Sequence, residues 1–224
     1  MVVPFIDFHT HRRRENTSII EVVSLHHQQD RPYDYCTVGF HPWWTKRPLD
    51  DQEIKSLKDK YMDDAGCLAI GECGLDKLKG ADLDTQEAIL IQQVNLANAL
   101  SSPVIIHCVR SFERILDIKK YHAKTPWVIH GFVRNKILAK QVLDAGILLS
   151  VAPNEAMSDN FIQTLKYLPT DSLFLETDSD DRWSIVKRYE IMAALCDYDM
   201  ESLKIKIFNN FTEIFKHKWK YPNG

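Results

Sequence analysis

Short apolar runs alternate along this chain with longer segments in which apolar residues recur every three or four positions. The short runs are typical of buried β-strands, and the longer segments are typical of helices that bury one face. The predicted strands span residues 2–6, 19–25, 35–42, 67–76, 104–107, 127–131, 147–151 and 173–178. The predicted helices span residues 50–63, 83–100, 112–121, 136–145, 158–168, 183–196 and 201–218.

Strand and helix alternate to the end of the chain, a pattern that predicts parallel strands joined by helices. About eight strands in this order favour an α/β fold of the TIM (β/α)8 barrel type. The segment between His11 and Ile19 is too short for a helix, so we expect an abbreviated first βα unit. That abbreviation helps to explain why 224 residues suffice for a barrel that usually needs about 250. We expect residues 1–224 to form one barrel domain.

Polar residues that bind metals well stand at the carboxyl ends of most predicted strands. They include five of the nine histidines in the chain, one glutamate and one aspartate. They are His9, His11, His41, Glu72, His107, His130 and Asp178. In a barrel these strand ends meet on one face, where active sites are built. Singly, each also suits a core histidine or a capping carboxylate, but together they would be buried without partners, which is costly. A metal cluster removes that cost.

The first of these motifs is Asp7-Phe8-His9-Thr10-His11. Alternate residues of a strand point the same way, so Asp7, His9 and His11 are predicted to share a face. Two imidazoles and a carboxylate suit a divalent metal, although the motif alone is equally compatible with two half-exposed histidines at a strand end. Because other carboxylates are available as ligands, we interpret Asp7 as a residue that orients an imidazole.

Four histidines and two carboxylates are too many ligands for one tetrahedral ion. They suit two ions about 3.5–4 Å apart with a bridging carboxylate. Two such ions lower the pKa of a bound water, and a nearby carboxylate can take the proton of that water. The predicted reaction class is metal-assisted hydrolysis. Histidine-rich ligation favours zinc, manganese or iron over magnesium, but Zn, Mn and Mg all remain candidates.

Composition narrows the function classes only slightly. A net charge of −3 argues against broad binding of nucleic acid along a basic face, but not against a local basic cleft. No apolar run is long enough to span a membrane, and the amino terminus does not resemble a signal peptide. The five cysteines are odd in number and include no C-x-x-C pair, so we expect reduced thiols in a cytoplasmic protein without an obligate protein partner.

Six short motifs, taken in order, resemble the successive signatures of the TatD-type deoxyribonucleases, a family of amidohydrolase-like metal barrels. They are D-F-H-T-H at 7–11, G-F-H-P at 39–42, G-E-C-G-L-D at 71–76, I-H-C-V-R at 106–110, I-H-G-F at 129–132 and L-E-T-D at 175–178. The segment N-N-F-T-E-I-F at 209–215 resembles the closing segment of the family. The resemblance therefore runs over nearly the whole chain.

The resemblance implies a TIM barrel and a metal-dependent nuclease that releases nucleotides from the ends or single strands of DNA. It implies that one ion is held by His9, His11, Glu72 and Asp178. Glu72 would bridge to a second ion that is held by His107 and His130. Asp178 would also act as a general base, and His41 and Arg110 would contact phosphate. Arg12, in the polar segment after the first motif, is a further candidate for phosphate binding.

Two loops depart from the family pattern, at residues 133–135 and 179–183. Asp180 and Asp181 in the second loop would repel a polyanion if they faced the cleft, and we interpret them as pointing to solvent. Three functions stay open: a DNA phosphodiesterase, a hydrolase of small esters, lactones, amides or phosphomonoesters, and a non-catalytic barrel kept for binding. Retention of all the ligand candidates weighs against the third.

Overall fold

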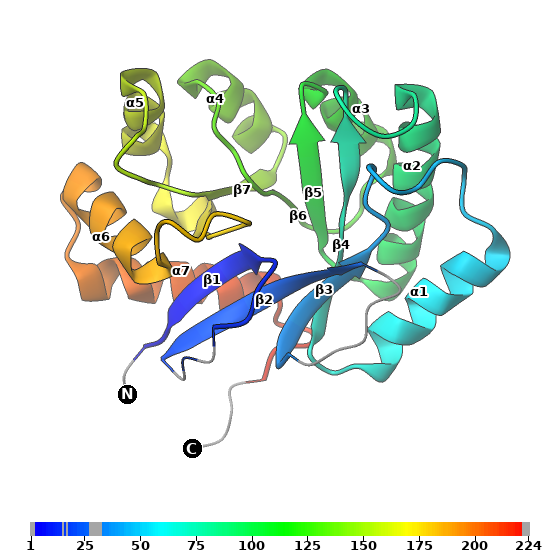
Figure 1. Ribbon diagram of the computed structural model, residues 1–224, viewed down its shortest axis with the longest axis horizontal. Coiled ribbons are helices and arrows are strands. Elements are labelled where there is room, and N and C mark those ends of the chain that lie inside the picture. Colours follow the sequence, from blue (N-terminus) through cyan, green and yellow to red (C-terminus); the bar gives the residue numbers. More distant parts are fainter. Residues whose placement is uncertain (1–2, 15, 17, 27–32, 221–224) are drawn as a thin grey trace.

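The computed structural model describes residues 3–14, 16, 18–26 and 33–220. Its eight strands form one parallel sheet in the order β1 to β8 (Figure 1). The strands are β1 (Phe5–Thr10), β2 (Ile19–His26), β3 (Tyr35–Gly39), β4 (Cys67–Asp76), β5 (Val104–Val109), β6 (Trp127–Ile129), β7 (Ile147–Val151) and β8 (Leu173–Leu175). The helices are α1 (Asp51–Asp63), α2 (Leu83–Leu100), α3 (Phe112–His122), α4 (Lys136–Asp144), α5 (Asp159–Tyr167), α6 (Ile185–Cys196) and α7 (Met200–Ile214), with the 3-10 turn η1 (Thr170–Ser172).

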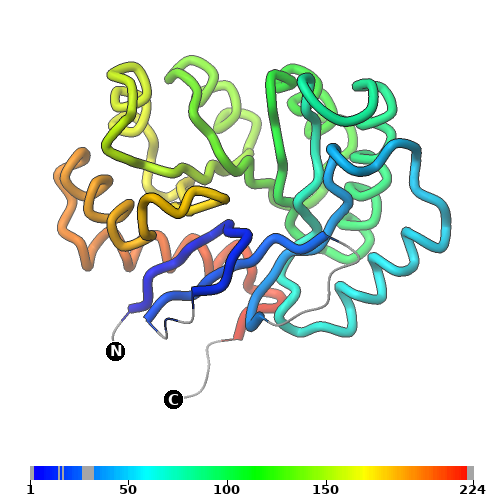
Figure 2. The backbone as a smooth tube through the Cα atoms, in the orientation of Figure 1, coloured from blue at the N-terminus to red at the C-terminus, as the bar shows by residue number. Residues whose placement is uncertain are grey.

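The first and last strands close the sheet into a barrel just beyond the end of β8. The Asp178 N–H donates to the His9 carbonyl at 2.8 Å, and the His11 N–H donates to the Asp178 carbonyl at 3.4 Å. A parallel bridge joins Thr10 to Asp178. The predicted TIM-barrel architecture is confirmed, and the chain trace in Figure 2 shows the helices wrapped around the outside of the strands.

Several predicted boundaries move by a few residues. β1 begins at Phe5 and runs on through His9, whereas the predicted strand covered 2–6, of which residue 2 lies outside the described residues. α7 ends at Ile214 rather than at Lys218, because the chain turns at Phe215. The described residues between β1 and β2 contain no helix, as expected, and neither do those between β2 and β3.

Stacked aromatic rings hold the closing strands against the last helix. The Phe8 ring of β1 stacks on Phe174 of β8 with 4.0 Å between ring centroids, and it also stacks on Phe215 at 5.7 Å. All three side chains are buried. Aromatic pairs of this kind add stabilisation beyond the area that they bury. Their packing therefore favours the strand contact that closes the barrel.

Three glutamines of α2 bind the backbone of the loops at the catalytic end of the barrel. Gln93 accepts from the Phe40 N–H at 2.8 Å and donates to the Phe40 carbonyl at 3.1 Å. Gln86 makes the same pair of bonds with the backbone of Asp76, at 2.7 and 3.0 Å. Gln92 does so with Leu49, at 2.8 Å each. Each side-chain amide thus pairs with a backbone N–H and a carbonyl that have no neighbouring strand to bond with.

We predict that Gln93→Leu lowers the free energy of unfolding by about 2–4 kcal/mol, because the buried N–H and carbonyl of Phe40 would both lose their partner. Urea denaturation followed by circular dichroism measures this. The control is Asn95→Leu, which changes an exposed position of the same helix and is expected to alter stability by less than about 0.5 kcal/mol. Equal effects of the two substitutions would contradict the role of Gln93.

Candidate metal centre

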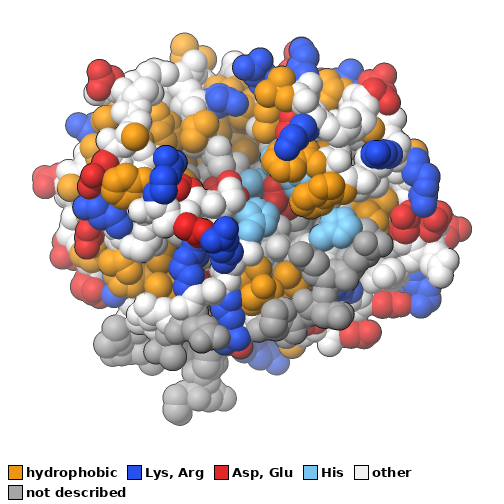
Figure 3. All heavy atoms as spheres, in the orientation of Figure 1, with side chains coloured by type: hydrophobic (Ala, Val, Ile, Leu, Met, Phe, Trp, Pro, Cys, Tyr) orange, Lys and Arg blue, Asp and Glu red, His pale blue; other side chains and the backbone are white. Residues whose placement is uncertain are grey.

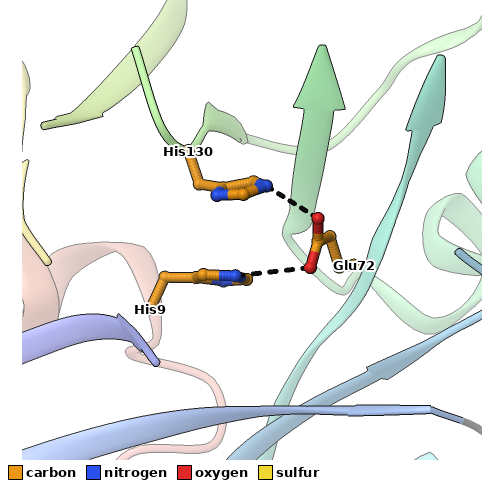
Figure 4. A group of neighbouring side chains, drawn as sticks. All are labelled: His9, Glu72 and His130. Carbon is orange, nitrogen blue, oxygen red and sulfur yellow. Dashed lines mark hydrogen bonds and ion pairs between the residues drawn. The ribbon is translucent and has the colours of Figure 1, made fainter. Parts of the chain in front are cut away.

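A single buried carboxylate, Glu72 of β4, lies at the centre of the site. Its Oε1 atom lies 3.0 Å from His41 Nε2, 2.8 Å from His107 Nδ1 and 2.8 Å from His130 Nε2. Its Oε2 atom lies 3.3 Å from His9 Nε2. Figure 4 shows the rings of His9 and His130 stacked above one another and pointing at the two oxygens of the carboxylate. Imidazoles from four different strand ends therefore converge on one group.

Glycine at position 74 allows this convergence. Gly74 has φ of +152°, and a Cβ atom there would lie 2.0 Å from the carbonyl oxygen of His107. Any other residue would push β4 away from β5, and Glu72 away from His107. The close approach of these two strands thus requires a residue without a side chain.

The second carboxylate of the site comes from the seam where the barrel closes. Asp178 Oδ1 lies 3.2 Å from His11 Nε2, and that nitrogen lies 3.8 Å from Glu72 Oε2. His9, His11 and Asp178 offer ligand atoms within 4.8 Å of one another, as do His9, Glu72 and His130. The structure thus brings all six predicted metal ligands to one place, with Glu72 in contact with His9 through Oε2 and with His107 and His130 through Oε1.

Two further carboxylates back the histidines, and the sequence patterns did not single them out. Asp76 Oδ2 lies 3.2 Å from the second ring nitrogen of His107, Nε2. Glu176, fully buried, accepts from the Gly131 N–H at 2.6 Å and lies 3.8 Å from His130 Nδ1. Carboxylates in this position orient metal-ligating histidines and raise their basicity. The signal that could have found them is their place inside the motifs G-E-C-G-L-D and L-E-T-D.

His41 differs from the other histidines in the use of its two nitrogens. The Trp43 N–H donates to His41 Nδ1 at 3.2 Å, so Nδ1 must carry a lone pair. Burial lowers the pKa of His41, which favours the neutral ring. The proton of the neutral ring is then on Nε2, the atom that faces Glu72. His41 is therefore arranged as a hydrogen-bond donor to Glu72, and it also forms, with Glu72 and His107, one of the groups that could hold a metal ion.

The charges in the site reinforce one another. Burial by itself would raise the pKa of Glu72, but the charge of His130 and hydrogen bonds from His107, His130 and His41 outweigh it, and the pKa lies well below its usual value. Burial likewise opposes the charging of His130, yet Glu72 and Glu176 raise the pKa of His130 well above its usual value. The pKa of His9 is lowered, mainly by burial and then by the charge of His130. Glu72 is therefore held as an anion within a cluster of imidazoles.

The donor set fits divalent metal ions. Among the described residues, His9 Nε2, His130 Nδ1 and Glu176 Oε2 are buried atoms without a hydrogen-bond partner. Both ring nitrogens of His107 face carboxylates, with Nδ1 2.8 Å from Glu72 and Nε2 3.2 Å from Asp76. A neutral ring can donate to only one of the two, so the other contact requires a second proton on the ring or a cation beside both atoms. Imidazole and carboxylate together are the ligands of zinc and of related divalent metals.

The interpretation of Asp7 as an imidazole-orienting residue is not supported by its contacts. The pairing of β1 with β2 shifts register between Asp7 and Thr10. Asp7 instead accepts from the Thr177 N–H at 2.8 Å and from the Thr177 hydroxyl at 2.7 Å. The guanidinium of Arg14 lies 3.3 Å from the same carboxylate. Burial raises the pKa of Asp7 to about 7. Asp7 thus holds the residue that precedes Asp178.

Asp180 and Asp181, the acids that follow Asp178, were expected to point to solvent. Their carboxylates instead contact arginines. Asp181 forms ion pairs with Arg12 and with Arg14, the latter at 3.0 Å. Asp180 pairs with Arg182 at 2.8 Å and with the fully buried Arg188 at 3.1 Å. Nearby arginines draw both carboxylates onto the protein and offset their charge.

The other predicted phosphate contact, Arg110, is exposed at the end of β5 and has a positive φ of 52°. It follows the strand of His107, so its backbone lies at the catalytic face. Arg12 is exposed as well and is joined to Asp181. The described structure leaves Arg110 open to solvent, whereas a phosphate at Arg12 would compete with an existing ion pair.

The strand ends of this parallel barrel bring four imidazoles and two carboxylates together. This is the architecture of a metal-dependent hydrolase. Residues 6–216 match the model of the TatD related DNase family, and the chain belongs to this family.

Relatives carry names that agree with this class. A protein named as an uncharacterized metal-dependent hydrolase from Methanocaldococcus jannaschii is 29% identical over 82% of this chain and 76% of its own length. A protein named as a 3'-5' ssDNA/RNA exonuclease, TatD, from Pectobacterium atrosepticum is 30% identical over 65% of this chain. The matched region spans only 58% of that exonuclease.

The fold itself is found in solved structures. The crystal structure of a TatD homologue from Escherichia coli aligns with a TM-score of 0.79 and covers 96% of this chain and 99% of the other. At 22% identity this likeness concerns the fold alone.

We predict that Asp7→Ala lowers the free energy of unfolding of the metal-free protein by about 2–4 kcal/mol, because a buried N–H and a guanidinium would lose their acceptor. Asp7→Asn keeps an acceptor for the Thr177 N–H and is expected to lose less. Urea denaturation with a chelator present measures both. Unchanged stability combined with weaker metal binding would instead assign Asp7 to the orientation of an imidazole.

Proposed function

We propose that this protein is a metal-dependent phosphodiesterase that hydrolyses DNA from its ends. The observation that carries the proposal is the buried cluster around Glu72, in which His9, His107 and His130 face one carboxylate at the catalytic end of the barrel. Membership of the TatD related DNase family supports a nuclease, and the name of the Pectobacterium relative supports exonucleolytic cleavage.

We propose two divalent ions as cofactors, with zinc, manganese and magnesium as candidates. His9, His11, Glu72 and Asp178 would hold one ion, and Glu72 would be shared with a second ion held by His107 and His130. Bound ions of this kind supply an acidified water and neutralise negative charge on the phosphate. The position of Glu72 supports a shared carboxylate, because Oε2 faces His9 while Oε1 faces His107 and His130.

Asp178 is proposed as the general base. Burial would raise the pKa of Asp178, but the hydrogen bond from His11 and the charges of His9 and His130 lower it below its usual range. The carboxylate is therefore ionised at neutral pH, and about a third of the side chain is open to solvent. It is thus placed to accept the proton of an attacking water.

His41, Arg110 and Arg12 are proposed to hold the substrate phosphate. His41 offers an Nε2–H donor at the centre of the site, because its other nitrogen is occupied by Trp43. Arg110 and Arg12 would supply positive charge at the rim. A guanidinium can bind a phosphate through two parallel hydrogen bonds, which would position the scissile bond.

We predict that Asp178→Ala lowers kcat for nucleotide release by about 10²–10⁴-fold, the usual contribution of general-base catalysis. Glu72→Ala is expected to abolish activity because it removes the carboxylate shared by both groups of ligands. The assay uses end-labelled single- and double-stranded DNA, with phosphomonoesters and carboxylic esters in parallel. Asp144→Ala, at an exposed surface ion pair, is the control. Turnover of only the small substrates would replace the nuclease with a small-molecule hydrolase.

The metal content provides a second, independent prediction. The protein saturated with Mn²⁺ or Zn²⁺ should retain two ions per chain, whereas His11→Ala and His107→Ala should each retain about one. Elemental analysis after dialysis measures the ratio. A ratio that remains below one ion per chain under saturating metal would refute the paired site.

We propose a cytoplasmic location, which the five free cysteines support. No helix in the described part of the chain has the length and apolar character needed to cross a membrane.

A further inference from the structure

One tryptophan is left exposed beside the candidate metal centre. Of the five tryptophans in the chain, all of which are described, Trp44 alone is exposed, with 60% of its surface accessible. Its ring lies 4.9 Å from the ring of His41, whose Nε2 atom is 3.0 Å from Glu72. Figure 3 shows histidines near the middle of this face, beside hydrophobic and basic side chains. A large, rigid aromatic surface thus stands one side chain away from the centre of the site.

The neighbouring Trp43 is bound in place, and it fixes the position of Trp44. The indole N–H of Trp43 donates to Asp76 at 2.6 Å, and its backbone N–H donates to His41. The Trp44 N–H donates to the His41 carbonyl at 3.2 Å, closing a turn. Trp43 is therefore part of the support of the histidines. The ring of Trp44 makes edge contacts with the rings of His26 and Trp43, and 60% of the surface of Trp44 remains accessible to a ligand.

Positive charge lies next to Trp43, the neighbour of Trp44 in the chain. Lys79 Nζ lies 3.7 Å from the centroid of the Trp43 ring. The turn that carries Lys79 packs against the segment before Trp43: at Gly80, φ is +92°, and a Cβ atom there would lie 2.2 Å from the Pro42 carbonyl oxygen. Lys77 of the same turn is exposed. An aromatic surface and cations on adjacent turns match the base and the phosphate of a nucleotide.

We propose that Trp44 is a stacking site for an unpaired nucleobase of the nucleic acid substrate, next to the nucleotide whose phosphodiester is cleaved. This inference rests on the proposed nuclease function. Stacking needs a free face of the base and no particular base edge, so the site selects single-stranded ends without selecting their sequence. In a duplex an internal base is covered on both faces, and a terminal base pair must open before one of its bases can lie on Trp44 unpaired. Trp44 therefore favours single-stranded ends.

The experiment compares a short dT strand with the same strand lacking the bases of its end nucleotides. Both strands carry phosphorothioate linkages to slow cleavage, and binding to the metal-loaded protein is followed by fluorescence anisotropy. The variants are Trp44→Ala and Trp44→Phe. The matched control is Tyr121→Ala, since Tyr121 is 69% exposed at the carboxyl end of α3, away from the catalytic face. Circular dichroism confirms that each variant is folded.

Wild-type protein and Tyr121→Ala are expected to bind the intact strand about 5- to 30-fold more tightly than the strand without end bases. The ratio of the two affinities falls close to one in Trp44→Ala, whereas Trp44→Phe keeps most of the preference for the intact strand. KM for ordinary single-stranded DNA rises in parallel. A Trp44→Ala protein that keeps the wild-type ratio, or that binds both strands more weakly by the same factor, overturns the stacking site.

The outcomes also separate this inference from the function on which it rests. Hydrolysis of DNA with a KM that does not depend on Trp44 refutes the stacking site and leaves the nuclease intact. Binding that depends on Trp44 and on the end bases, without hydrolysis under any metal, refutes the nuclease and leaves the stacking site. A wild-type protein that binds neither strand refutes both.

Discussion

The site depends on a single unfavourable placement, a carboxylate buried at the centre of a ring of imidazoles. Glu72 is only 4% exposed, and no arginine or lysine forms an ion pair with it among the described residues. A buried carboxylate without such a partner is costly, and imidazoles compensate for it only in part. The remaining demand for positive charge favours a metal ion at this cluster.

Much of the surrounding structure serves to keep these groups in place. Gln93 binds the backbone next to His41, and Gln86 binds the backbone of Asp76, which in turn contacts His107. The residues that contact the ligands are themselves held by side chains of α2. A metal site requires placement to within about 0.5 Å, and support of this kind achieves it on loops that would otherwise be mobile.

The strand-end positions of the ligands were predictable from the sequence, because apolar runs mark strands and the next polar residue then lies at one end of the barrel. The contacts that the ligands and their neighbours make with other residues were not predictable. The alternation of a strand predicts that Asp7 shares a face with His9, but the contacts of Asp7 are with Thr177 and Arg14. The protonation pattern of His41 depends on a backbone N–H of Trp43, which no side-chain pattern encodes. Asp181 forms an ion pair with Arg14, which is distant in sequence, and Asp180 forms one with Arg188, which only the fold brings within reach.

The seam between the first and last strands has a consequence for the behaviour of the whole molecule. Asp178 donates its N–H to the carbonyl of His9 there, and the side chains of both residues belong to one proposed group of ligands. The same two residues thus link the ends of the sheet through the backbone, and their side chains would hold an ion of the proposed group. A ligand that binds only the closed form stabilises it by mass action. The metal concentration would then determine the stability of the closed barrel. The stability of the fold and the occupancy of the active site would therefore depend on each other.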